Sequence, residues 1–311
     1  GLTNLQAHGQ ESSAALSSGA LRDTLLDAAP PDTVSHIAQI FDRLPPRERP
    51  HIEHAQVLLA LGELHRAIPA LLEGARQARD SFSPHQALEL YDQIIAEQDI
   101  GRSEQTTSLL ESANVCLKLG LHGEAIRRYQ SCPPTVDAEL GLATAYMQSG
   151  RYKEIPHVLG DIMSELEPEH AEADVIYARS HLLAGNLEAC EKSVGLAHAR
   201  FETHPRANRL KATQGLIHFY QGDIREARHI LEEAYAHAKE TGDGDLDAIR
   251  SNLALILQKD HDVDGSRRLY GESLDYARTQ HDLPHQVIRL TNLGAIEHED
   301  GQYVEALECY R

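Results

Sequence analysis

Apolar residues along most of this chain recur every three or four positions, the spacing of an amphipathic helix, and the apolar runs occur in pairs separated by short turns. Two segments share this layout most closely: NLALILQKDHDVDGSRRLY, which begins at Asn252, and NLGAIEHEDGQYVEALECY, which begins at Asn292. Their matching positions are 40 residues apart. Self-similarity at a fixed period indicates a repeat protein, and here each repeat is a helical hairpin.

Three positions define the repeated unit and recur upstream. The turn residue is usually glycine, the residue seven positions before it is always Ala or Gly, and the residue nine positions after it is always Leu, Val or Tyr. Two helices approach closely only where they present small side chains, and a large residue can then cover the gap between them. The pattern therefore predicts how each hairpin packs. The turn positions are Gly62, Phe82, Gly120, Gly150, Gly185, Gly222, His261 and Gly301.

The apolar periodicity on either side of these turns predicts the helices. Only 20 residues separate the turn positions Gly62 and Phe82, so the helix over 64–79 is expected to serve two neighbouring hairpins. The predicted helices are 51–61, 64–79, 84–97, 103–119, 122–131, 135–149, 152–166, 169–184, 187–200, 205–221, 224–240, 245–259, 263–279, 284–299 and 303 to the end.

Residues 1–49 do not follow the repeat and are predicted to form a separate N-terminal helical segment ahead of the hairpins of 50–311. We expect a short helix around Leu21 to Leu26 and a second from Asp32 to Leu44, with Asp32 as its N-cap. Arg311 falls inside a predicted second helix. The sequence is therefore expected to be part of a longer chain, truncated within the last of about seven to eight hairpins.

The residues Gly294, Gly301, Tyr303 and Ala306 occupy the small, turn-glycine, aromatic and alanine positions of the tetratricopeptide repeat, which this unit resembles. The resemblance covers about residues 50–311 and implies an all-α, right-handed superhelical solenoid. The longer repeats, with AKETGD and ARTQHD at their junctions, look like those of large bacterial signalling proteins.

A second, shorter resemblance concerns the N-terminal segment. LRDTLLDAAP, followed by RLPPRERPHIEHAQ, resembles the junction between the winged-helix end of a signalling ATPase and its tetratricopeptide tail. In that family the ATPase lies upstream and is often joined to a kinase, cyclase or transcription-factor domain. The resemblance thus implies an effector domain ahead of this sequence.

The net charge and the apolar runs of the sequence limit the classes of partner that the chain can bind. The formal charge at pH 7 is −19 and no cluster of Lys and Arg interrupts it, which argues against direct binding of nucleic acid. No apolar run approaches the length of a membrane span, and no signal peptide is recognisable, so a cytoplasmic protein without a membrane partner is expected. The four cysteines lack a CxxC spacing, which fits reduced thiols.

The strongest candidate for metal binding is the run Asp260, Asp262, Asp264 and Gly265, which has the order that opens an EF-hand calcium loop. That loop requires a bidentate glutamate at its twelfth position, which here is Gly271. Because the run also coincides with a repeat turn, where aspartate is favoured as a helix cap, the capping interpretation is preferred.

The sequence gives no support for a zinc site, a nucleotide-binding site or a cysteine nucleophile. His51 with His54, and His281 with His285, could share a helix face but lack a third ligand nearby. The HExxH motif, the P-loop and the kinase catalytic loop are absent, and neither Cys116 nor Cys132 has a recognisable activating base. We therefore predict no catalytic, metal-binding or cofactor-binding residues in this segment.

The tetratricopeptide resemblance implies a concave groove, lined by the first helix of each hairpin, that binds a partner protein or peptide. Many groove positions could equally pack against the adjacent repeat. A lysine-based clamp for C-terminal carboxylates, known in one subfamily, is absent, since its lysine position carries apolar or hydroxyl residues from Leu110 to Thr291. The predicted partner-binding residues are Arg179, Arg209, Leu216, Phe219, Leu255, Gln258, Thr291 and His298.

These observations predict a non-catalytic protein-interaction and regulatory module within a multidomain bacterial signalling protein. In this hypothesis the partner occupies the groove and changes the arrangement of the hairpins. The alternative is a receptor for a short signalling peptide that controls an attached kinase, ATPase or transcription-factor domain.

Overall fold

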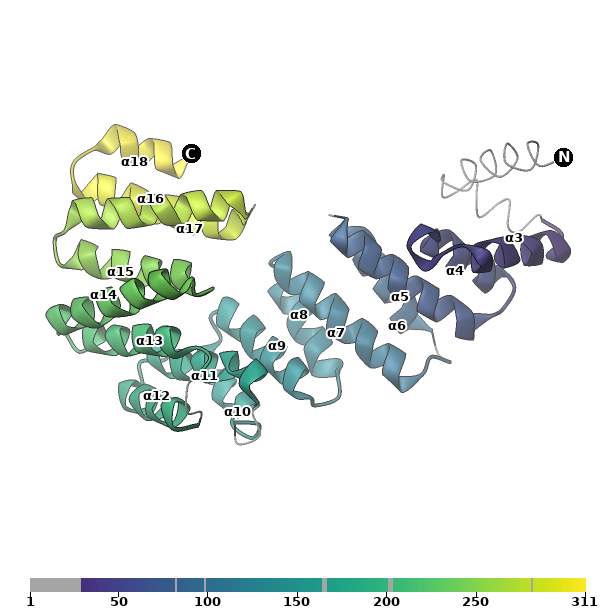
Figure 1. Cartoon of the computed structure of the whole chain (residues 1–311), viewed down its shortest axis with the longest axis horizontal. Coiled ribbons are helices and arrows are strands. Elements are labelled where there is room, and N and C mark those ends of the chain that lie inside the picture. Colours follow the sequence, from purple (N-terminus) through teal and green to yellow (C-terminus); the bar gives the residue numbers. More distant parts are fainter. Residues whose placement is uncertain (1–28, 82, 98, 164–166, 201–203, 281) are drawn as a thin grey trace. The chain divides into compact units, whose positions relative to one another are not determined.

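The computed structural model describes residues 29–311 except 82, 98, 164–166, 201–203 and 281, and in these residues it contains helices and no strand (Figure 1). The short helix predicted around residues 21–26 lies outside the described residues. The α-helices are α3 (Pro31–Arg43), α4 (His51–Ala60), α5 (Leu64–Asp80), α6 (Pro84–Ala96), α7 (Arg102–Lys118), α8 (His122–Ser131), α9 (Val136–Gln148), α10 (Ile155–Leu159), α11 (Glu172–Leu183), α12 (Leu187–Arg200), α13 (Ala207–Tyr220), α14 (Ile224–Thr241), α15 (Leu246–Lys259), α16 (Val263–Thr279), α17 (Leu283–Glu299) and α18 (Tyr303–Tyr310).

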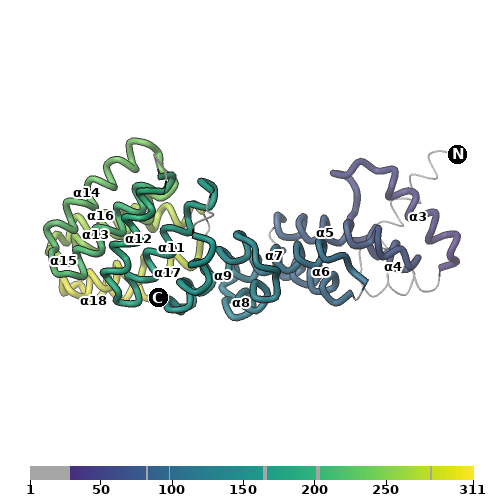
Figure 2. Tube along the Cα trace, turned by 90° about the horizontal axis from the view of Figure 1, so that it is seen from below, coloured from purple at the N-terminus to yellow at the C-terminus, as the bar shows by residue number. Residues whose placement is uncertain are grey.

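The chain forms two compact units, unit 1 (residues 1–145) and unit 2 (residues 146–311). In unit 1, α4 to α7 follow one another in space in the order of the sequence (Figures 1 and 2), and α5 packs against both α4 and α6. The prediction that this helix serves two hairpins is therefore confirmed. In unit 2, helices α11 to α18 pack in consecutive pairs, so the all-α solenoid predicted from the repeats is the fold observed.

The helix α3 packs onto α4 and α5 through Val34 and Ala38, which are buried against Val57, Leu58 and Ala67. The division predicted between residues 49 and 50 stays a prediction. Asp32 is not the N-cap of α3, because that position belongs to Pro30, which makes no side-chain hydrogen bond. Asp32 lies instead in the first turn, where its negative charge is favoured by the helix dipole.

The small positions of the repeat lie at the close contacts within each hairpin. A Cβ atom added to Gly215 of α13 would lie 2.9 Å from Cγ of Leu231 in α14. One added to Gly294 of α17 would lie 2.6 Å from Cε1 of Tyr310 in α18. The large residue nine positions after the turn thus covers the small residue seven positions before it, as the pattern predicts.

The turn positions share a backbone conformation. The glycines at 62, 120, 150, 185, 222 and 301 have φ between 72° and 90°, the left-handed region that closes a helix. His261, which replaces glycine in the α15–α16 turn, has φ 63° and is exposed. A side chain in this region is strained because its Cβ approaches the following carbonyl.

Replacing His261 with glycine is therefore expected to raise the free energy of local unfolding of α15 and α16 by about 1 kcal/mol. Native-state amide hydrogen exchange of these two helices measures the change. The matched control is Gly222→His in the equivalent α13–α14 turn, which should lower the stability of its own hairpin by a similar amount. A destabilising effect of the glycine at 261 would contradict the strain argument.

One predicted helix is wrong. In place of a helix over 152–166, the structure has a 3-10 turn (Tyr152–Glu154) followed by the short helix α10, in the described part of that range. Pro156 lies in the first turn of α10 and has no N–H to donate to the carbonyl of Tyr152, which favours the start of a new helix at this point. Ile155 and Leu159 are nevertheless fully buried, so this short helix still fills both packing positions of the repeat.

A buried polar network joins three helices of unit 2. Asp247 of α15 accepts a hydrogen bond of 2.6 Å from the hydroxyl of Ser273 in α16. The same hydroxyl accepts one of 2.7 Å from Nε of the buried Arg289 in α17, whose Nη2 lies 3.4 Å from the Asp247 carboxylate. Arg250 Nη1 also donates to Asp247, at 3.2 Å. The carboxylate of Asp247 therefore organises the α15–α17 interface.

Candidate functional site

The concave side of unit 2 can be recognised from its contacts. The first helices α11, α13 and α15 of successive hairpins contact one another, whereas the second helices α12, α14 and α16 make fewer contacts with each other. In a curved stack of hairpins the helices on the inner side lie closer together. The helices α11, α13 and α15 therefore line the concave side, and we call this surface the groove.

The predicted partner-binding residues fall into different environments. Leu216 belongs to the buried core of unit 2, and Phe219 packs against that core, so both hold α13 in place. Leu255 is half-buried on α15. Three others, Gln258, Thr291 and His298, lie on α15 and α17.

Those last three already have neighbours within the chain. Gln258 donates a hydrogen bond of 2.8 Å to Glu299 and so joins α15 to α17. Thr291 is exposed and its hydroxyl donates to the carbonyl of Val287 in its own helix. The exposed His298 ring meets Tyr303 edge-on, with ring centroids 5.4 Å apart.

Arg179 of α11 and Arg209 of α13 are the two predicted residues that the structure brings together. Both are half-buried, and they belong to adjacent groove helices. Burial, followed by the positive charge of Arg209, lowers the pKa of Arg179 to about 10. The two guanidinium groups thus lie close enough to repel each other, and Arg179 stays charged at neutral pH.

Neither arginine has a partner among the residues that the structure describes. Arg179 and Arg209 make no hydrogen bond and no ion pair with them, and Nε of Arg209 is buried without an acceptor. Partial removal of water from a cation that makes no ion pair costs free energy. Such a cost is common where a protein keeps groups ready for a ligand.

The other arginines of the described chain behave differently. Each one that is not exposed to solvent interacts with a carboxylate or a backbone carbonyl. Arg76, for example, donates to Glu111 at 2.7 Å, and Arg289 is held by Ser273 and Asp247. Arg179 and Arg209 are thus exceptional in having no acceptor.

The nearest acidic groups are engaged elsewhere. Glu172 of α11 lies 3.2 Å from Nε of Arg206, and Nη1 of the same arginine lies 3.3 Å from Asp245. Burial raises the pKa of Glu172, and Arg209 and Arg206 oppose that rise. Taken together, this part of the groove carries three guanidinium groups and two carboxylates. It therefore has one positive charge in excess, in a chain whose formal charge is −19.

Sequence analysis missed Arg206 and Asp245. The two residues are 39 positions apart, close to the 40-residue shift between the last two repeats. Opposite charges at equivalent places in successive hairpins are therefore the signal that could have revealed them. Their pairing orders the charges next to Arg209 and leaves that arginine without a carboxylate of its own.

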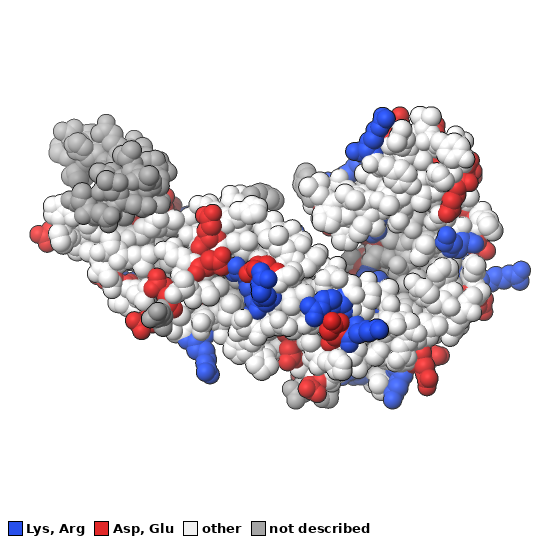
Figure 3. All heavy atoms as spheres, turned by 180° about the vertical axis from the view of Figure 1, so that it is seen from behind, with Lys and Arg blue, Asp and Glu red and all other residues white. Residues whose placement is uncertain are grey.

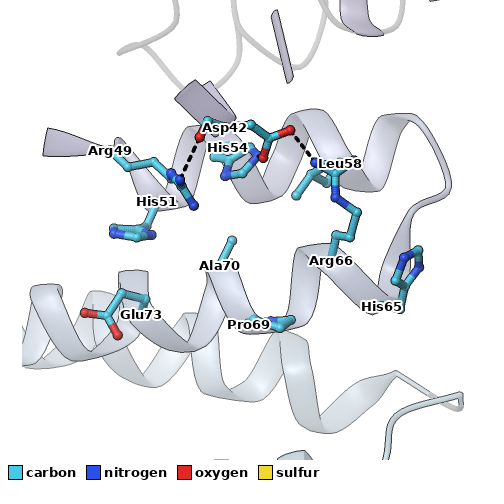
Figure 4. A pocket seen from close by; sticks show the side chains of 10 residues that line it. All are labelled: Asp42, Arg49, His51, His54, Leu58, His65, Arg66, Pro69, Ala70 and Glu73. Atoms are coloured by element: carbon cyan, nitrogen blue, oxygen red, sulfur yellow. Dashed lines mark hydrogen bonds and ion pairs between the residues drawn. The ribbon is translucent and has the colours of Figure 1, made fainter. Parts of the chain in front are cut away.

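A pocket of about 330 Å³ in unit 1, formed by α3, α4, α5 and the turn between α3 and α4, is a second candidate (Figure 4). Asp42 lies at its centre, with Oδ1 3.3 Å from Nε2 of His54 and Oδ2 hydrogen-bonded to Arg66. Arg49 donates to the carbonyl of Asp42 at 3.0 Å, and His51 Nε2 lies 2.9 Å from the carbonyl of Pro46.

The charges in this pocket are therefore mostly satisfied within the chain. Burial lowers the pKa of His54, and Arg49 and Arg66 act in the same direction against Asp42, so the imidazole is neutral at pH 7. The interactions join α3 to α4 and α5. We conclude that the pocket holds the first helices of unit 1 together and lacks the unpaired charge of the groove.

The aspartates of the α15–α16 turn have structural roles. Asp262 caps α16 by accepting a hydrogen bond of 3.0 Å from the N–H of Gly265. Asp260 and Asp262 both pair with Arg228, at 2.7 and 3.2 Å, and Asp264 pairs with Arg267. The capping interpretation of this run is thus confirmed. Within the described ranges no group of three His, Cys, Asp or Glu side chains is placed to hold a metal ion.

The surface offers no continuous basic region on the face shown in Figure 3. Lys and Arg lie there among Asp and Glu and do not form a stripe. Stripes of that kind are what binds a phosphate backbone. None of the described helices has the length and apolar character needed to span a membrane.

The comparisons with known proteins concern structure, since neither a family model nor a curated protein matches the sequence. The chain is similar to a tetratricopeptide repeat protein from Parabacteroides merdae, with 13% identity, a TM-score of 0.54 and coverage of 78% of this chain and 98% of that one. It is also similar to the apo form of RapI, with 13% identity, a TM-score of 0.55 and coverage of 78% and 95%.

A third similar structure is a Signal Transduction ATPase with Numerous Domains from Pyrococcus horikoshii that has a tetratricopeptide repeat sensor. The identity is 12% and the TM-score 0.53, and the match covers 93% of this chain but only 51% of that one. At these identities the likeness concerns the fold alone.

Proposed function

We propose that this chain, an all-α solenoid with the tetratricopeptide-repeat fold, is a protein-interaction and regulatory module that binds a protein or peptide partner in the groove of unit 2. The observation that carries the proposal is the unpaired couple Arg179 and Arg209 on adjacent groove helices. Charged groups that are kept desolvated and without partners support a binding role for the surface that holds them.

The regulatory part of the proposal follows from how hairpins stack. Each hairpin of a solenoid contacts only its neighbours, so the angle between two hairpins is set by one interface. A partner that touches both α11 and α13 binds one arrangement of these hairpins better than others and shifts the population toward it. That shift is the signal passed to whatever is attached to the chain.

The alternative is a sensor for a short signalling peptide that controls an attached effector domain. Two features support it. The first feature is the structural likeness to the ATPase with a tetratricopeptide repeat sensor. The other is the resemblance of residues 21–30 and 43–78 to the junction between such an ATPase and its repeats. In this version an ATPase, kinase or transcription-factor domain precedes Gly1 in the full-length protein.

The test is affinity capture from a lysate of the source organism, comparing the wild type with an Arg179→Gln, Arg209→Gln variant. The matched control is Arg225→Gln, Arg268→Gln, which removes the same charge from exposed positions on α14 and α16. We expect a partner retained by the wild type and the control and lost from the groove variant. Retention by all three proteins would place the binding surface elsewhere.

A further inference from the structure

We propose that Asp42, His54 and Arg66 form a pH-sensitive latch, which holds α3 on α4 and α5 at neutral pH and releases it when His54 is protonated. These residues lie in unit 1, so the latch is independent of the groove of unit 2. Three features support it: the surroundings of the His54 ring, the charges that face the ring, and the small apolar contact of α3.

The His54 ring is buried without a hydrogen bond. The residue is 3% exposed, and its ring lies edge-on to Phe41 of α3, with ring centroids 5.8 Å apart. Neither ring nitrogen makes a hydrogen bond with a described residue, although Nε2 lies 3.3 Å from Oδ1 of Asp42. An imidazolium carries a charge and two N–H donors, and burial without acceptors is far more costly for it than for a neutral ring. The surroundings therefore suit the neutral form.

The charges around the ring also oppose its protonation. The carboxylate of Asp42 faces the ring, but Oδ2 of this carboxylate is already hydrogen-bonded to Arg66 of α5 (Figure 4). Arg49 lies on the same aspartate, donating to its backbone carbonyl at 3.0 Å. Burial lowers the pKa of His54, and Arg49, Arg66 and His51 act in the same direction against Asp42. A proton on His54 would thus add a second cation to a carboxylate that already has one.

The other titratable side chains that line this pocket are His51, His65 and Glu73. Nε2 of His51 donates to the carbonyl of Pro46 at 2.9 Å. That nitrogen carries its proton in both charge states, so protonation of His51 leaves the contact intact. His65 is exposed, and Glu73 lies 3.7 Å from Arg76 of its own helix. None of these three joins α3 to the hairpin through a contact that a proton would break.

The sign of the pH effect follows from this arrangement. The pKa of His54 is lower in the folded chain than in an open state, where it is about 6.5. The contribution of His54 to holding α3 is therefore complete above about pH 6.5 and is lost as the pH falls toward the pKa of the folded state. Acid favours the state in which α3 has moved away and water surrounds the imidazolium.

The helix α3 is the element that can move. Its buried apolar side chains are Val34 and Ala38, and it packs onto α4 less extensively than α5 does. A helix with so small an apolar contact depends on its polar contacts to stay in place. Its release would uncover an apolar surface formed by Val57, Leu58 and Ala67. One proton on one side chain would thus expose a surface that is buried at neutral pH.

Amide hydrogen exchange of the full 311-residue chain at pH 7.5 and pH 6.0, corrected for the intrinsic rate at each pH, tests the latch. We expect the equilibrium constant for opening of α3 to rise about threefold, because an open state with a pKa near 6.5 gains about that factor from protonation. The helix α7, which has no histidine and no residue in the pocket, is the internal reference. An equal rise in α7 would show that the chain opens as a whole and would overturn the proposal.

Two substitutions identify the titrating group. His54→Met keeps a side chain of similar length without a titratable group, so the opening of α3 should no longer depend on pH. The matched control, His65→Gln, removes an exposed histidine from the same pocket and should leave the threefold rise unchanged. Persistence of the pH dependence in His54→Met would assign it to another group and refute the latch.

A third substitution separates the latch from a purely structural role of the same residues. Arg66→Gln removes a cation near His54 and leaves Asp42 free to pair with the imidazolium, so the threefold ratio between the two pH values should fall toward one. If Arg66 only supported the fold, opening of α3 would increase equally at both pH values and the ratio would stay at three.

A titration of the wild type checks the proposal without any variant. The ring signals of His54, assigned by their nuclear Overhauser contacts with Phe41, should titrate in NMR spectra with a midpoint below that of a free histidine, about 6.5. A midpoint at or above this value would mean that protonation does not weaken the contact of α3, and the proposal would be wrong.

Discussion

Asp247→Ala is expected to lower the free energy of local unfolding of α15, α16 and α17 by about 3 kcal/mol, among the largest effects of any single substitution in unit 2. The substitution removes the acceptor of Ser273 and the charge that faces Arg250 and Arg289. Arg289 is only 7% exposed, so its guanidinium would be left buried with the Ser273 hydroxyl alone. Native-state hydrogen exchange of the three helices measures the loss.

Two further variants make this test specific. Asp275→Ala removes an exposed aspartate that pairs with Arg278 one turn away in α16, and its effect should stay within about 0.5 kcal/mol. Asp247→Leu combined with Arg289→Met removes the charges of Asp247 and Arg289 together, while Arg250 keeps Glu272 as a partner at 3.5 Å, and it should be less damaging than Asp247→Ala alone. If Asp247→Ala and Asp275→Ala lowered the free energy of local unfolding equally, the network around Asp247 would contribute nothing to stability.

Gly215→Val is expected to destabilise the α13–α14 hairpin by about 2 kcal/mol. Its Cβ would lie 2.9 Å from Cγ of Leu231 and 3.3 Å from the carbonyl oxygen of Ala227. The second of these atoms belongs to the backbone, so the helices must move apart to admit the side chain. Loss of hydrogen-exchange protection in α13 and α14 measures the effect.

Gly195→Ala in α12 is the matched control. No atom lies within 4 Å of the Cβ that would be added there, and the residue is exposed within a helix. Alanine should therefore stabilise α12 by about 0.5 to 1 kcal/mol, since glycine loses more backbone freedom on folding. If Gly215→Val and Gly195→Ala both lowered stability, close packing at Gly215 could not be the cause of the loss.

The arrangement of hairpins could be predicted from the sequence because its determinants are local. Gly215 and Leu231 belong to one hairpin, and their spacing from the turn at Gly222 is repeated in the other hairpins. The same alignment placed His261 at a turn position before its φ of 63° was known. The error at α10 arose because Pro156 was counted as an ordinary member of a periodic run, although a proline favours the first turn of a helix, where its missing N–H has no cost.

The candidate site could be predicted only in part. Arg179, Arg206 and Arg209 look alike in the sequence, since all three lie in or beside the first helices of unit 2. Whether such a side chain has a partner depends on residues of neighbouring hairpins, as the pairing of Arg206 with Asp245 shows. Periodicity identifies the face of a helix but not the distance between two charges on different helices. The absence of an acceptor for Arg179 and Arg209 therefore required the structure.

The stacking of hairpins in unit 2 also has a mechanical consequence. Because each hairpin touches only its neighbours, tension applied to the two ends of the unit acts on the hairpin interfaces in series, and the weakest interface opens first. The helices α12 and α13 pack less extensively than α14 with α15 or α16 with α17, so this junction is expected to open before those two. A partner that contacts both α11 and α13 would span that junction and would raise the tension needed to open it.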